Sequence, residues 1–235
     1  MIDIPIVILC GGLGTRLKSV VRDVPKVLAE ISGRPFLAHL LDRLRDHGAQ
    51  EILLSTGYKS EMLEQFVDDR TDDGMQIRCI REDQPLGTGG ALRFVSDEAK
   101  LTFPFVALNG DTFFSGDLEH LIRFHRESRA AGTLAVVEVP AADRYGTVEF
   151  DSSTGELTTF EEKASGSGPS WINAGAYVIE RPILELVPEK RSVSLERDVL
   201  PAWVGRGLFA CPFRQAQFLD IGTPDDYTRA QDLLG

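Results

Sequence analysis

The feature that most constrains the fold is a short apolar run near the start of the chain, followed at once by glycines. Residues 6–10 read Ile-Val-Ile-Leu-Cys, and their richness in β-branched side chains predicts a strand buried on both faces. Gly11, Gly12 and Gly14 come next. Because glycine has no Cβ, backbone N–H groups at these positions can approach a ligand closely and form a concave row of donors. The stretch therefore predicts an anion-binding loop at the end of a buried strand.

Two cations follow the glycines. Arg16 offers a forked guanidinium that suits phosphate oxygens, and Lys26 adds an ammonium shortly after it. Together with the bare backbone, these groups predict a site for the polyphosphate of a nucleotide. Two familiar nucleotide loops do not match, because the chain has no Gly-x-x-x-x-Gly-Lys-Ser/Thr string and Leu17 stands where a dinucleotide loop needs its third glycine. The second expected strand, 51–55, also ends without the acid that would hold a ribose hydroxyl.

Composition narrows the class of partner. The chain has 235 residues, of which 43% are hydrophobic and 26% charged, and this length is enough to bury one sizeable core. A net charge of −11 disfavours binding to nucleic acid or to an anionic membrane. No apolar run approaches the ~18 residues of a membrane span, so no membrane insertion is expected. Three widely spaced cysteines, Cys10, Cys79 and Cys211, favour a reducing compartment, and we expect a cytoplasmic protein.

Strands and helices alternate through residue 140, and short strands dominate afterwards. Strands are expected at 6–10, 51–55, 75–80, 103–108, 134–139, 147–150, 157–160, 174–179, 208–211 and 217–219, with a loop at 165–170. Helices are expected at 35–47, 60–67, 117–128, 182–187, 195–203 and 224–234, and another runs from a glycine-rich turn at 84–91 to residue 95. This order predicts a single α/β domain, residues 1–235, with a Rossmann-like, doubly wound, predominantly parallel mixed sheet.

Two aspartates are expected at the same edge of that sheet as the glycine loop. Asp111 follows the strand 103–108, and Asp220 ends the strand 217–219. Ligands in such folds lie beyond the carboxyl ends of the strands, where a carboxylate would repel a triphosphate unless a divalent cation lay between them. Mg²⁺ takes one or two carboxylates together with phosphate oxygens and water. Each aspartate alone could equally be a turn or helix-cap residue, but with the phosphate loop the pair predicts a magnesium site.

Two further groups could contact a second substrate. Lys163 belongs to a Glu-Glu-Lys string after the strand 157–160 and could neutralise a second phosphate. A neighbouring glutamate and lysine are, however, usually charged residues on a solvated surface. Asn173 and Gly175 could offer an amide and a bare backbone to sugar hydroxyls. The four histidines show no metal-ligand spacing, and no Gly-x-Ser-x-Gly elbow supports a serine hydrolase.

At this point the chain resembles the sugar-phosphate nucleotidyltransferases, also called nucleoside-diphosphate-sugar pyrophosphorylases, over essentially its whole length. The resemblance rests on an ordered series of motifs: Gly11-Gly12-Leu13-Gly14-Thr15-Arg16, Pro25-Lys26, Leu86-Gly87-Thr88-Gly89, Asn109-Gly110-Asp111, Tyr145-Gly146, Glu162-Lys163, Asn173-Ala174-Gly175 and Asp220-Ile221-Gly222-Thr223-Pro224. The first, third and fourth look most like the branch of the family that makes GDP-heptose. Val27 stands where the family commonly has a second proline, and no C-terminal β-helix like that of some relatives is expected.

The resemblance implies a role for each matching position. It implies a nucleotide-binding part over about 1–140, a sugar-binding part over about 141–223 and a C-terminal helix at 224–235. The nucleotide would contact Leu9, Gly11, Gly12, Gly14, Thr15, Gln84, Gly87 and Thr88. The sugar would contact Gly146, Glu162, Asn173 and Gly175. The catalytic positions would be Arg16, Lys26, Asp111, Lys163 and Asp220, with Asp111 and Asp220 as the ligands of Mg²⁺.

The resemblance thus implies transfer of a nucleoside monophosphate from GTP, or another NTP, to a sugar 1-phosphate. Several alternatives stay open at this stage. The base and sugar could differ, for example mannose 1-phosphate with GTP or glucose 1-phosphate with UTP or dTTP. The chain could be a non-catalytic subunit that binds nucleotide sugars. The charged residues that are present argue against this alternative, because a homologue without activity could lose them. The chain could also be a glycosyltransferase that uses a nucleotide sugar. Such enzymes usually carry an Asp-x-Asp motif at the strand that binds the metal, whereas this chain has a single acid there, Asp111. A homo-oligomer is compatible with the sequence, which specifies no oligomeric state.

Overall fold

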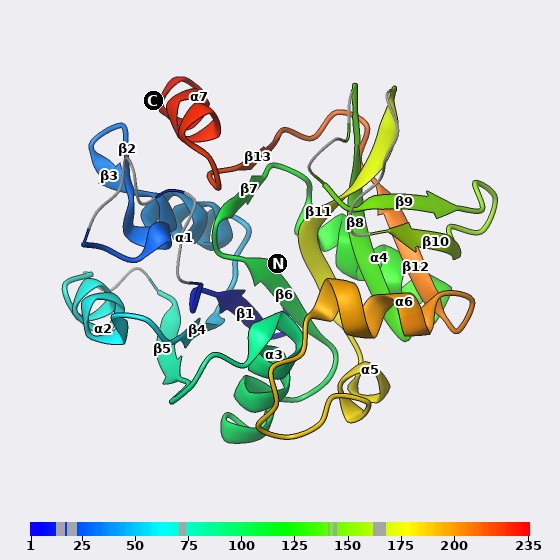
Figure 1. The fold of residues 1–235 in the computed structure, drawn as a ribbon, viewed down its shortest axis with the longest axis horizontal. Helices are drawn as coiled ribbons and strands as arrows, with labels where there is room; N and C mark the ends of the chain where they lie inside the picture. Colours follow the sequence, from blue (N-terminus) through cyan, green and yellow to red (C-terminus); the bar gives the residue numbers. More distant parts are fainter. Residues whose placement is uncertain (13–16, 18–22, 71–73, 141, 143–144, 162–167) are drawn as a thin grey trace.

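The computed structural model describes residues 1–12, 17, 23–70, 74–140, 142, 145–161 and 168–235. A nine-stranded sheet forms its centre, and seven of the strands run in the order β10-β9-β11-β6-β1-β4-β5 (Figure 1). Four parallel strands make up one side of this sheet: β1 (Ile6–Leu9), β4 (Glu51–Thr56), β5 (Gln76–Arg81) and β6 (Phe105–Asn109). Parallel neighbours place the carboxyl ends of these strands, and the loops that follow them, at one edge.

The other side of the sheet is mixed. Strand β11 (Ser170–Ile179) runs antiparallel to β6 and also pairs with β8 (Gly132–Val139), which in turn pairs parallel with β12 (Leu208–Pro212). A hairpin of β9 (Thr147–Phe150) and β10 (Leu157–Glu161) adds to β11. Two short pairs complete the strands: β2 (Glu30–Ile31) with β3 (Arg34–Pro35), and β7 (Thr112–Phe114) with β13 (Phe218–Asp220).

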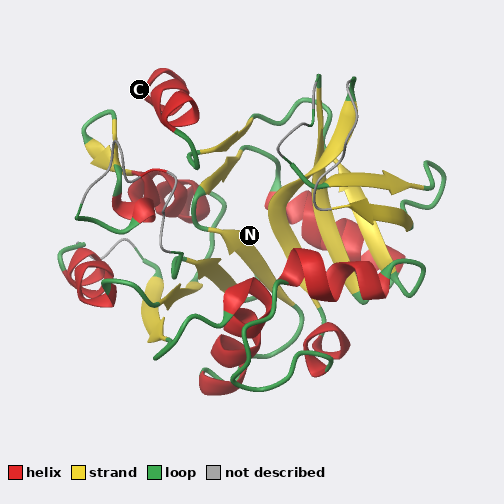
Figure 2. Cartoon of the chain, in the orientation of Figure 1, coloured by secondary structure: helices red, strands yellow, loops and turns green. Residues whose placement is uncertain are grey.

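Helices cover both faces of the sheet (Figure 2). One face packs against α1 (Phe36–Asp46), α2 (Ser60–Asp68) and α4 (Leu118–Ser128). The opposite face packs against α3 (Gly87–Glu98), α5 (Arg181–Glu185), a π-helical turn η3 (Leu195–Val199) and α6 (Leu200–Trp203). Lys26–Leu28 form a 3₁₀ turn, η2, and α7 (Pro224–Leu233) closes the chain.

Strand β1 shows why the sheet needs a layer of helices on each of its two faces. Ile6 and Ile8 belong to one hydrophobic core and Val7 to the other, and all three side chains are fully buried. Successive side chains of a strand point to opposite faces, so an uninterrupted apolar run can be satisfied only in the middle of a three-layer structure. The predicted doubly wound, predominantly parallel α/β fold is confirmed.

The observed elements differ from the expected ones mainly at one strand boundary and by three short strands. Of the loop expected at 165–170, residues 165–167 lie outside the described residues, and β11 already begins at Ser170, four residues before the strand expected at 174–179. Strands β2, β3 and β7 were not expected, because each has only two or three residues and gives no measurable alternation. The division into a nucleotide-binding and a sugar-binding part stays a prediction.

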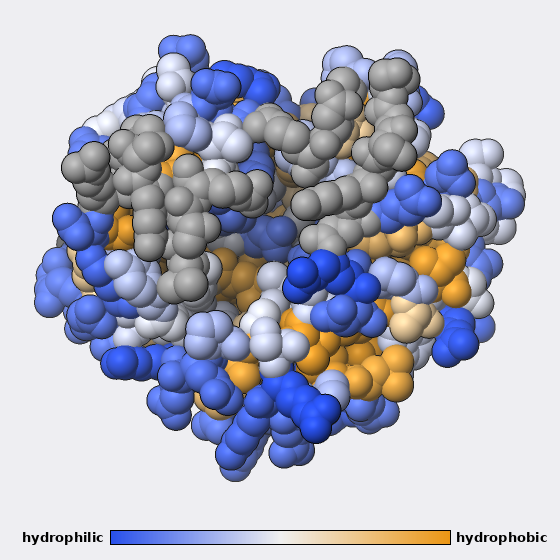
Figure 3. Space-filling view, in the orientation of Figure 1, coloured by the Kyte–Doolittle hydropathy of each residue, from blue (hydrophilic) through white to orange (hydrophobic). Residues whose placement is uncertain are grey.

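Apolar side chains are largely packed away from solvent in the described residues. Figure 3 shows a mainly hydrophilic surface on one face, with an apolar area near α5 and α6. The large apolar residues that are exposed are Met1, Tyr58 and Leu186. Scattered exposure of this kind is ordinary for a globular protein. No helix among the described segments combines the length and the apolar character that crossing a bilayer requires.

A buried histidine on α4 predicts how stability depends on pH. His125 is 2% exposed, its Nδ1 lies 2.9 Å from Oγ1 of Thr133, and its Nε2 lies 3.6 Å from Oε1 of Glu180. Burial lowers the pKa of this imidazole, with Arg126 acting in the same direction and Glu180 opposing it. The unfolded chain therefore takes up the proton first as pH falls, so the contribution to stability is complete above about pH 6.5 and is lost below it.

We expect the urea midpoint of unfolding to fall between pH 7 and pH 5.5, and to fall less in His125→Asn. Chemical denaturation of both proteins at several pH values measures this difference. His120→Asn, which changes a half-buried histidine of the same helix, serves as the control. An identical fall in the wild type and in His125→Asn would show that this imidazole does not contribute.

Candidate functional site

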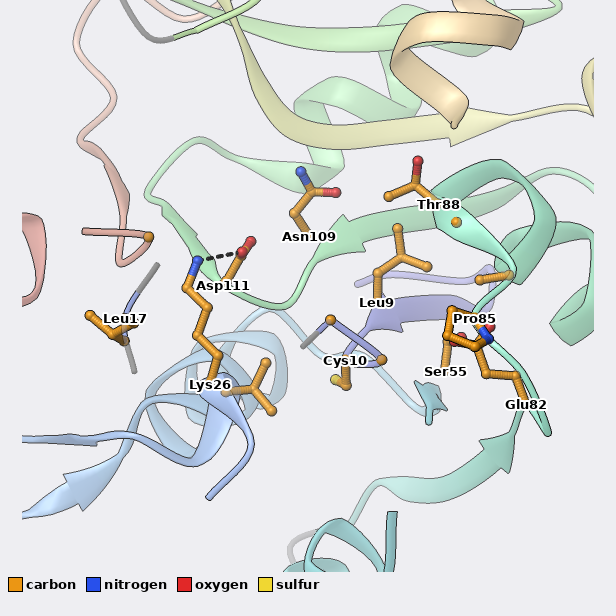
Figure 4. Close-up of a pocket in the computed structure, with 16 residues that line it drawn as sticks. Leu9, Cys10, Leu17, Lys26, Ser55, Glu82, Pro85, Thr88, Asn109 and Asp111 are labelled. Atoms are coloured by element: carbon orange, nitrogen blue, oxygen red, sulfur yellow. Dashed lines mark hydrogen bonds and ion pairs between the residues drawn. The ribbon is translucent and has the colours of Figure 1, made fainter. Parts of the chain in front are cut away.

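A cavity of about 370 Å³ lies at the carboxyl edge of the parallel strands (Figure 4). This volume is in the range of small-molecule sites. The four parallel strands and the segments that follow them supply most of its wall, which consists of Leu9, Cys10, Gly11, Gly12, Leu17, Lys26, Val27, Ser55, Glu82, Pro85, Gly87, Thr88, Ala91, Asn109, Asp111 and Gly222. The cavity therefore lies where a parallel α/β sheet normally binds its ligand.

The first glycine loop forms the floor of the cavity. Cys10 donates its backbone N–H to the carbonyl of Ser55 at 2.8 Å, and Gly110 donates to the carbonyl of Leu9 at 3.0 Å. These two bonds hold the ends of β1, β4 and β6 together. Gly11 and Gly12 then line the cavity, as expected for the anion loop. Gly14, Thr15 and Arg16 lie outside the described residues, so their placement is not part of this geometry.

Lys26 joins the two predicted metal ligands. Its Nζ lies 2.6 Å from Oδ2 of Asp111 and 3.2 Å from Oδ1 of Asp220, and its side chain is only 11% exposed. Figure 4 shows the contact between the lysine and Asp111 at one end of the cavity. The structure thus brings together three of the five residues expected to be catalytic, although their numbers span most of the chain. Lys163, like Arg16, lies outside the described residues.

The pairing of two short strands brings Asp220 to this position. Strand β13 runs antiparallel to β7, so that Asp220 stands opposite Thr112, and Ile221 donates its N–H to the carbonyl of Asp111 at 3.0 Å. The following helix is well anchored, because Thr223 caps α7 by accepting from the N–H of Asp226. A backbone register therefore fixes the two carboxylates side by side.

The two carboxylates have the donor chemistry that a hard divalent cation requires. Their side chains are 39% and 27% exposed, and both reach the same ammonium group. No cluster of three or more potential metal-ligating side chains is present in the parts of the chain that are described. Mg²⁺ needs only one or two carboxylates when phosphate oxygens and water complete its shell. Asp111 and Asp220 therefore fit a cation that binds together with a nucleotide.

The second glycine loop opens α3 beside the cavity. Gly87 and Thr88 line the cavity, whereas Gln84 is exposed and donates from Nε2 to the carbonyl of Lys190 at 3.4 Å. The N–H groups of Gly89 and Gly90 both donate to the carbonyl of Val193. Of the three residues expected along base and ribose, the structure places two on the cavity wall and one outside it.

Gly87 is a position at which only glycine fits. Its φ is +69°, and a Cβ there would lie 2.6 Å from the carbonyl oxygen of Val193. We expect Gly87→Ala to destabilise the protein by about 2–4 kcal/mol, because a strained backbone conformation adds to a clash with rigid backbone. Gly33→Ala is the matched control, since Gly33 also has a positive φ but a Cβ there meets nothing within 4 Å. Equal losses of unfolding free energy in the two variants would contradict the clash.

The expected sugar-binding residues adjoin the cavity through β11. Asn173 donates its backbone N–H to the carbonyl of Gly146 at 3.0 Å, and its Oδ1 accepts from the N–H of Gly175 at 3.1 Å. A Cβ on Gly175 would lie 2.9 Å from Nδ2 of Asn109, which lines the cavity. Three of the four residues expected to contact the sugar are thus close to one another and to the cavity. The fourth, Glu162, lies outside the described residues.

The cavity also contains polar residues to which the sequence analysis gave no role. Oδ1 of Asn109 is buried and has no hydrogen-bond partner among the described residues, which makes it available to a ligand. Glu82 is 8% exposed, burial raises its pKa, and its Oε2 accepts from the N–H of Leu86 at 3.3 Å. Both residues could have been identified from the sequence by their place relative to the strands, because Asn109 ends β6 and Glu82 directly follows β5.

Comparison with known proteins agrees with this geometry. The family model for nucleotidyl transferase matches residues 6–234. Two relatives are D-glycero-alpha-D-manno-heptose 1-phosphate guanylyltransferases. The one from Aneurinibacillus thermoaerophilus is 38% identical over 97% of this chain and 97% of its own length. The one from Campylobacter jejuni is 37% identical over 94% of this chain and 96% of its own length.

A mannose-1-phosphate guanylyltransferase from Mycobacterium tuberculosis is 37% identical over 95% of this chain, which spans 62% of that relative's length. Among solved structures, HddC from Yersinia pseudotuberculosis complexed with GMP-PN is similar with a TM-score of 0.85 and 34% identity, covering 99% of this chain and 100% of the other. Sequence and structure therefore agree on the same group of relatives.

Proposed function

Because this chain belongs to the nucleotidyl transferase family, we propose that it transfers GMP from GTP to D-glycero-α-D-manno-heptose 1-phosphate and releases pyrophosphate. The observation that carries the proposal is the contact of Lys26 with both Asp111 and Asp220 at a cavity lined by glycines. The choice of base and sugar rests on two relatives of matching length that are named for this reaction. The solved relative that holds GMP-PN also supports a guanine nucleotide.

The chemistry needs positioning and charge neutralisation more than proton transfer. A phosphate monoester loses its second proton with a pKa of about 6, so the attacking oxygen needs no general base at neutral pH. That oxygen forms a bond to the α-phosphorus of GTP, and the bond between the α-phosphorus and the bridging oxygen breaks as pyrophosphate leaves. The sugar C1–O bond stays intact, so the anomeric configuration is retained.

The chain's own residues divide this work. Backbone N–H groups around Gly11 and Gly12 would receive the triphosphate, and Lys26 would neutralise charge that moves onto its oxygens. Asp111 and Asp220 would hold Mg²⁺, which when bound supplies Lewis-acid stabilisation of the phosphate oxygens. Asn173 would contact the sugar. Arg16 and Lys163 are proposed to add charge on the nucleotide and on the sugar phosphate.

A second candidate keeps the mechanism and changes the sugar. The mycobacterial relative is named for mannose 1-phosphate, and it is as similar in sequence as the heptose enzymes. Release of pyrophosphate, measured with four NTPs crossed against heptose, mannose and glucose 1-phosphates, distinguishes the two. Turnover confined to GTP and the heptose phosphate supports the proposal, whereas another productive pair replaces the substrate. Binding of nucleotide sugars without any turnover would favour a non-catalytic role.

We place this reaction in the cytoplasm. The cysteines Cys10, Cys79 and Cys211 are all free thiols, which suits a reducing compartment. Burial raises the pKa of Cys79 to about 11 and that of Cys211 to about 12, so these thiols stay protonated and unreactive.

Lys163→Ala tests the proposed hold on the sugar phosphate. We expect KM for the sugar 1-phosphate to rise by about 10-fold or more while KM for GTP changes little, because an ammonium–phosphate contact is lost on one substrate only. Steady-state kinetics with each substrate varied in turn measure the two constants. A rise confined to GTP would instead assign Lys163 to the triphosphate.

A further inference from the structure

The carboxylate of Glu196 connects two parts of the site that are far apart in sequence. Glu196 lies in the π-helical turn η3, outside the residues that line the cavity. Its Oε2 accepts from Oγ1 of Thr88 at 2.7 Å and from Oγ of Ser194 at 3.0 Å. Its Oε1 accepts from the hydroxyl of Tyr177 at 3.3 Å. Three hydroxyl donors therefore converge on one side chain to which neither sequence motifs nor the proposed mechanism give a role.

One arm of this network ends at the nucleotide loop. Thr88 lines the cavity at the start of α3, and its Oγ1 also accepts from the N–H of Leu195 at 2.7 Å. Because that backbone group can only donate, the hydroxyl hydrogen of Thr88 must point to Glu196. The rotamer of Thr88 is thereby fixed from η3 and not from its own helix.

The other arm ends at the residues expected to contact the sugar. Tyr177 is fully buried, and burial together with Glu196 raises its pKa well above the ordinary value, so the phenol keeps its proton and donates. Its oxygen accepts from Nδ2 of Asn173 at 2.6 Å, while Oδ1 of Asn173 accepts from the N–H of Gly175. Every donor and acceptor in this arm is determined, which also fixes the orientation of the amide.

Glu196 is thus the shared acceptor at which both arms end. A hydrogen-bond network in which every direction is set behaves as one unit, so that moving one member shifts the others. Only one of the two amide hydrogens of Asn173 is used by Tyr177. The second has no acceptor among the described residues, which leaves it available to a hydroxyl group of a substrate.

We propose that Glu196 is a positioning residue that couples the nucleotide site to the sugar site, by holding Thr88 and, through Tyr177, Asn173 in one hydrogen-bonded unit. This inference rests on the proposed function. A nucleotide that contacts Thr88 would stabilise the hydrogen-bonded arrangement seen in the structure, and the network would extend that stabilisation to the amide of Asn173 that the sugar 1-phosphate contacts. The sugar 1-phosphate is therefore expected to bind more tightly to the nucleotide complex than to the free protein.

The test measures the dissociation constant of the sugar 1-phosphate with and without a non-hydrolysable GTP analogue, by calorimetry. In the wild type we expect the analogue to tighten binding by about 5- to 100-fold. Glu196→Gln leaves an acceptor for Thr88 but turns an amide donor toward Tyr177, so the coupling factor is expected to fall to about one while the analogue alone binds with little change. Tyr177→Phe cuts the same arm and should reproduce this result.

Two controls separate positioning from folding. Glu185→Gln removes the same charge at an exposed position of α5 and should keep the wild-type coupling factor. Urea denaturation shows whether a variant has lost stability. A coupling factor of one in the wild type, or wild-type coupling in Glu196→Gln, overturns the inference while leaving the function intact. Absence of turnover by the wild type with every substrate pair overturns the proposed function itself, and this inference with it.

Discussion

Replacing Asp111 with asparagine is expected to lower kcat by about 10³-fold while changing the dissociation constant of GTP by less than about 10-fold. A metal-bound phosphate gains several kcal/mol of stabilisation in the transition state, and about 4 kcal/mol corresponds to this loss in rate. Asparagine keeps the shape of the side chain and removes only its charge. On the proposed function, the triphosphate would keep its contacts with the glycine loop and Lys26, so binding is expected to change much less than turnover.

The rate of pyrophosphate release and the binding of a GTP analogue give the two quantities separately. Asp46→Asn is the matched control, since it makes the same change on a side chain that is 70% exposed on α1 and should leave both unchanged. The magnesium dependence of the remaining activity adds an independent readout, because a site with one carboxylate needs more metal to fill. Turnover of Asp111→Asn at the wild-type rate would contradict the assignment of this carboxylate.

Lys26→Met is expected to lower kcat/KM by about 10²–10³-fold, the cost of removing one preorganised group that stabilises developing charge. The ammonium lies 2.6 Å and 3.2 Å from the carboxylates of Asp111 and Asp220. Its removal leaves these two negative groups facing each other without their cation, and on the proposed function the triphosphate would lose the same positive charge. Lys26→Arg should recover part of the loss. The recovery is incomplete because the planar, delocalised guanidinium does not place its charge as the compact ammonium of lysine does.

Steady-state kinetics together with urea denaturation tell a catalytic role from a structural one. Lys100→Met, which removes a lysine at an exposed position after α3, should leave both measurements as in the wild type. A variant of Lys26 that is less stable yet retains its kcat/KM would show that the lysine only holds the two aspartates in place.

Sequence reasoning succeeded where the sheet itself determines position. The apolar run of β1, the glycines after it and Asp111 after β6 follow from one rule, because parallel strands place their carboxyl ends at one edge. Asp220 was expected at the same edge from its place after an apolar strand. Its actual position depends on the pairing of β13 with β7, a three-residue strand too short to give a periodic signal.

The remaining parts of the site depend on contacts that no local pattern encodes. Gln84 was expected along the nucleotide, but it is exposed and bonded to the carbonyl of Lys190, more than a hundred residues away in the chain. The network around Glu196 needs a π-helical turn to lie against the start of α3, and a five-residue turn has no amphipathic period to reveal it. Such placements come from tertiary packing and are visible only in the folded chain.

The measurement that tests the central claim most directly follows labelled oxygen through the reaction. D-glycero-α-D-manno-heptose 1-phosphate is prepared with ¹⁸O in the non-bridging phosphate oxygens and incubated with GTP, Mg²⁺ and the protein. Guanylyl transfer predicts GDP-heptose that carries the label, including its diphosphate bridge, and pyrophosphate that carries none. Labelled pyrophosphate, or a labelled heptose phosphate that stays unchanged while GTP is consumed, would contradict the account.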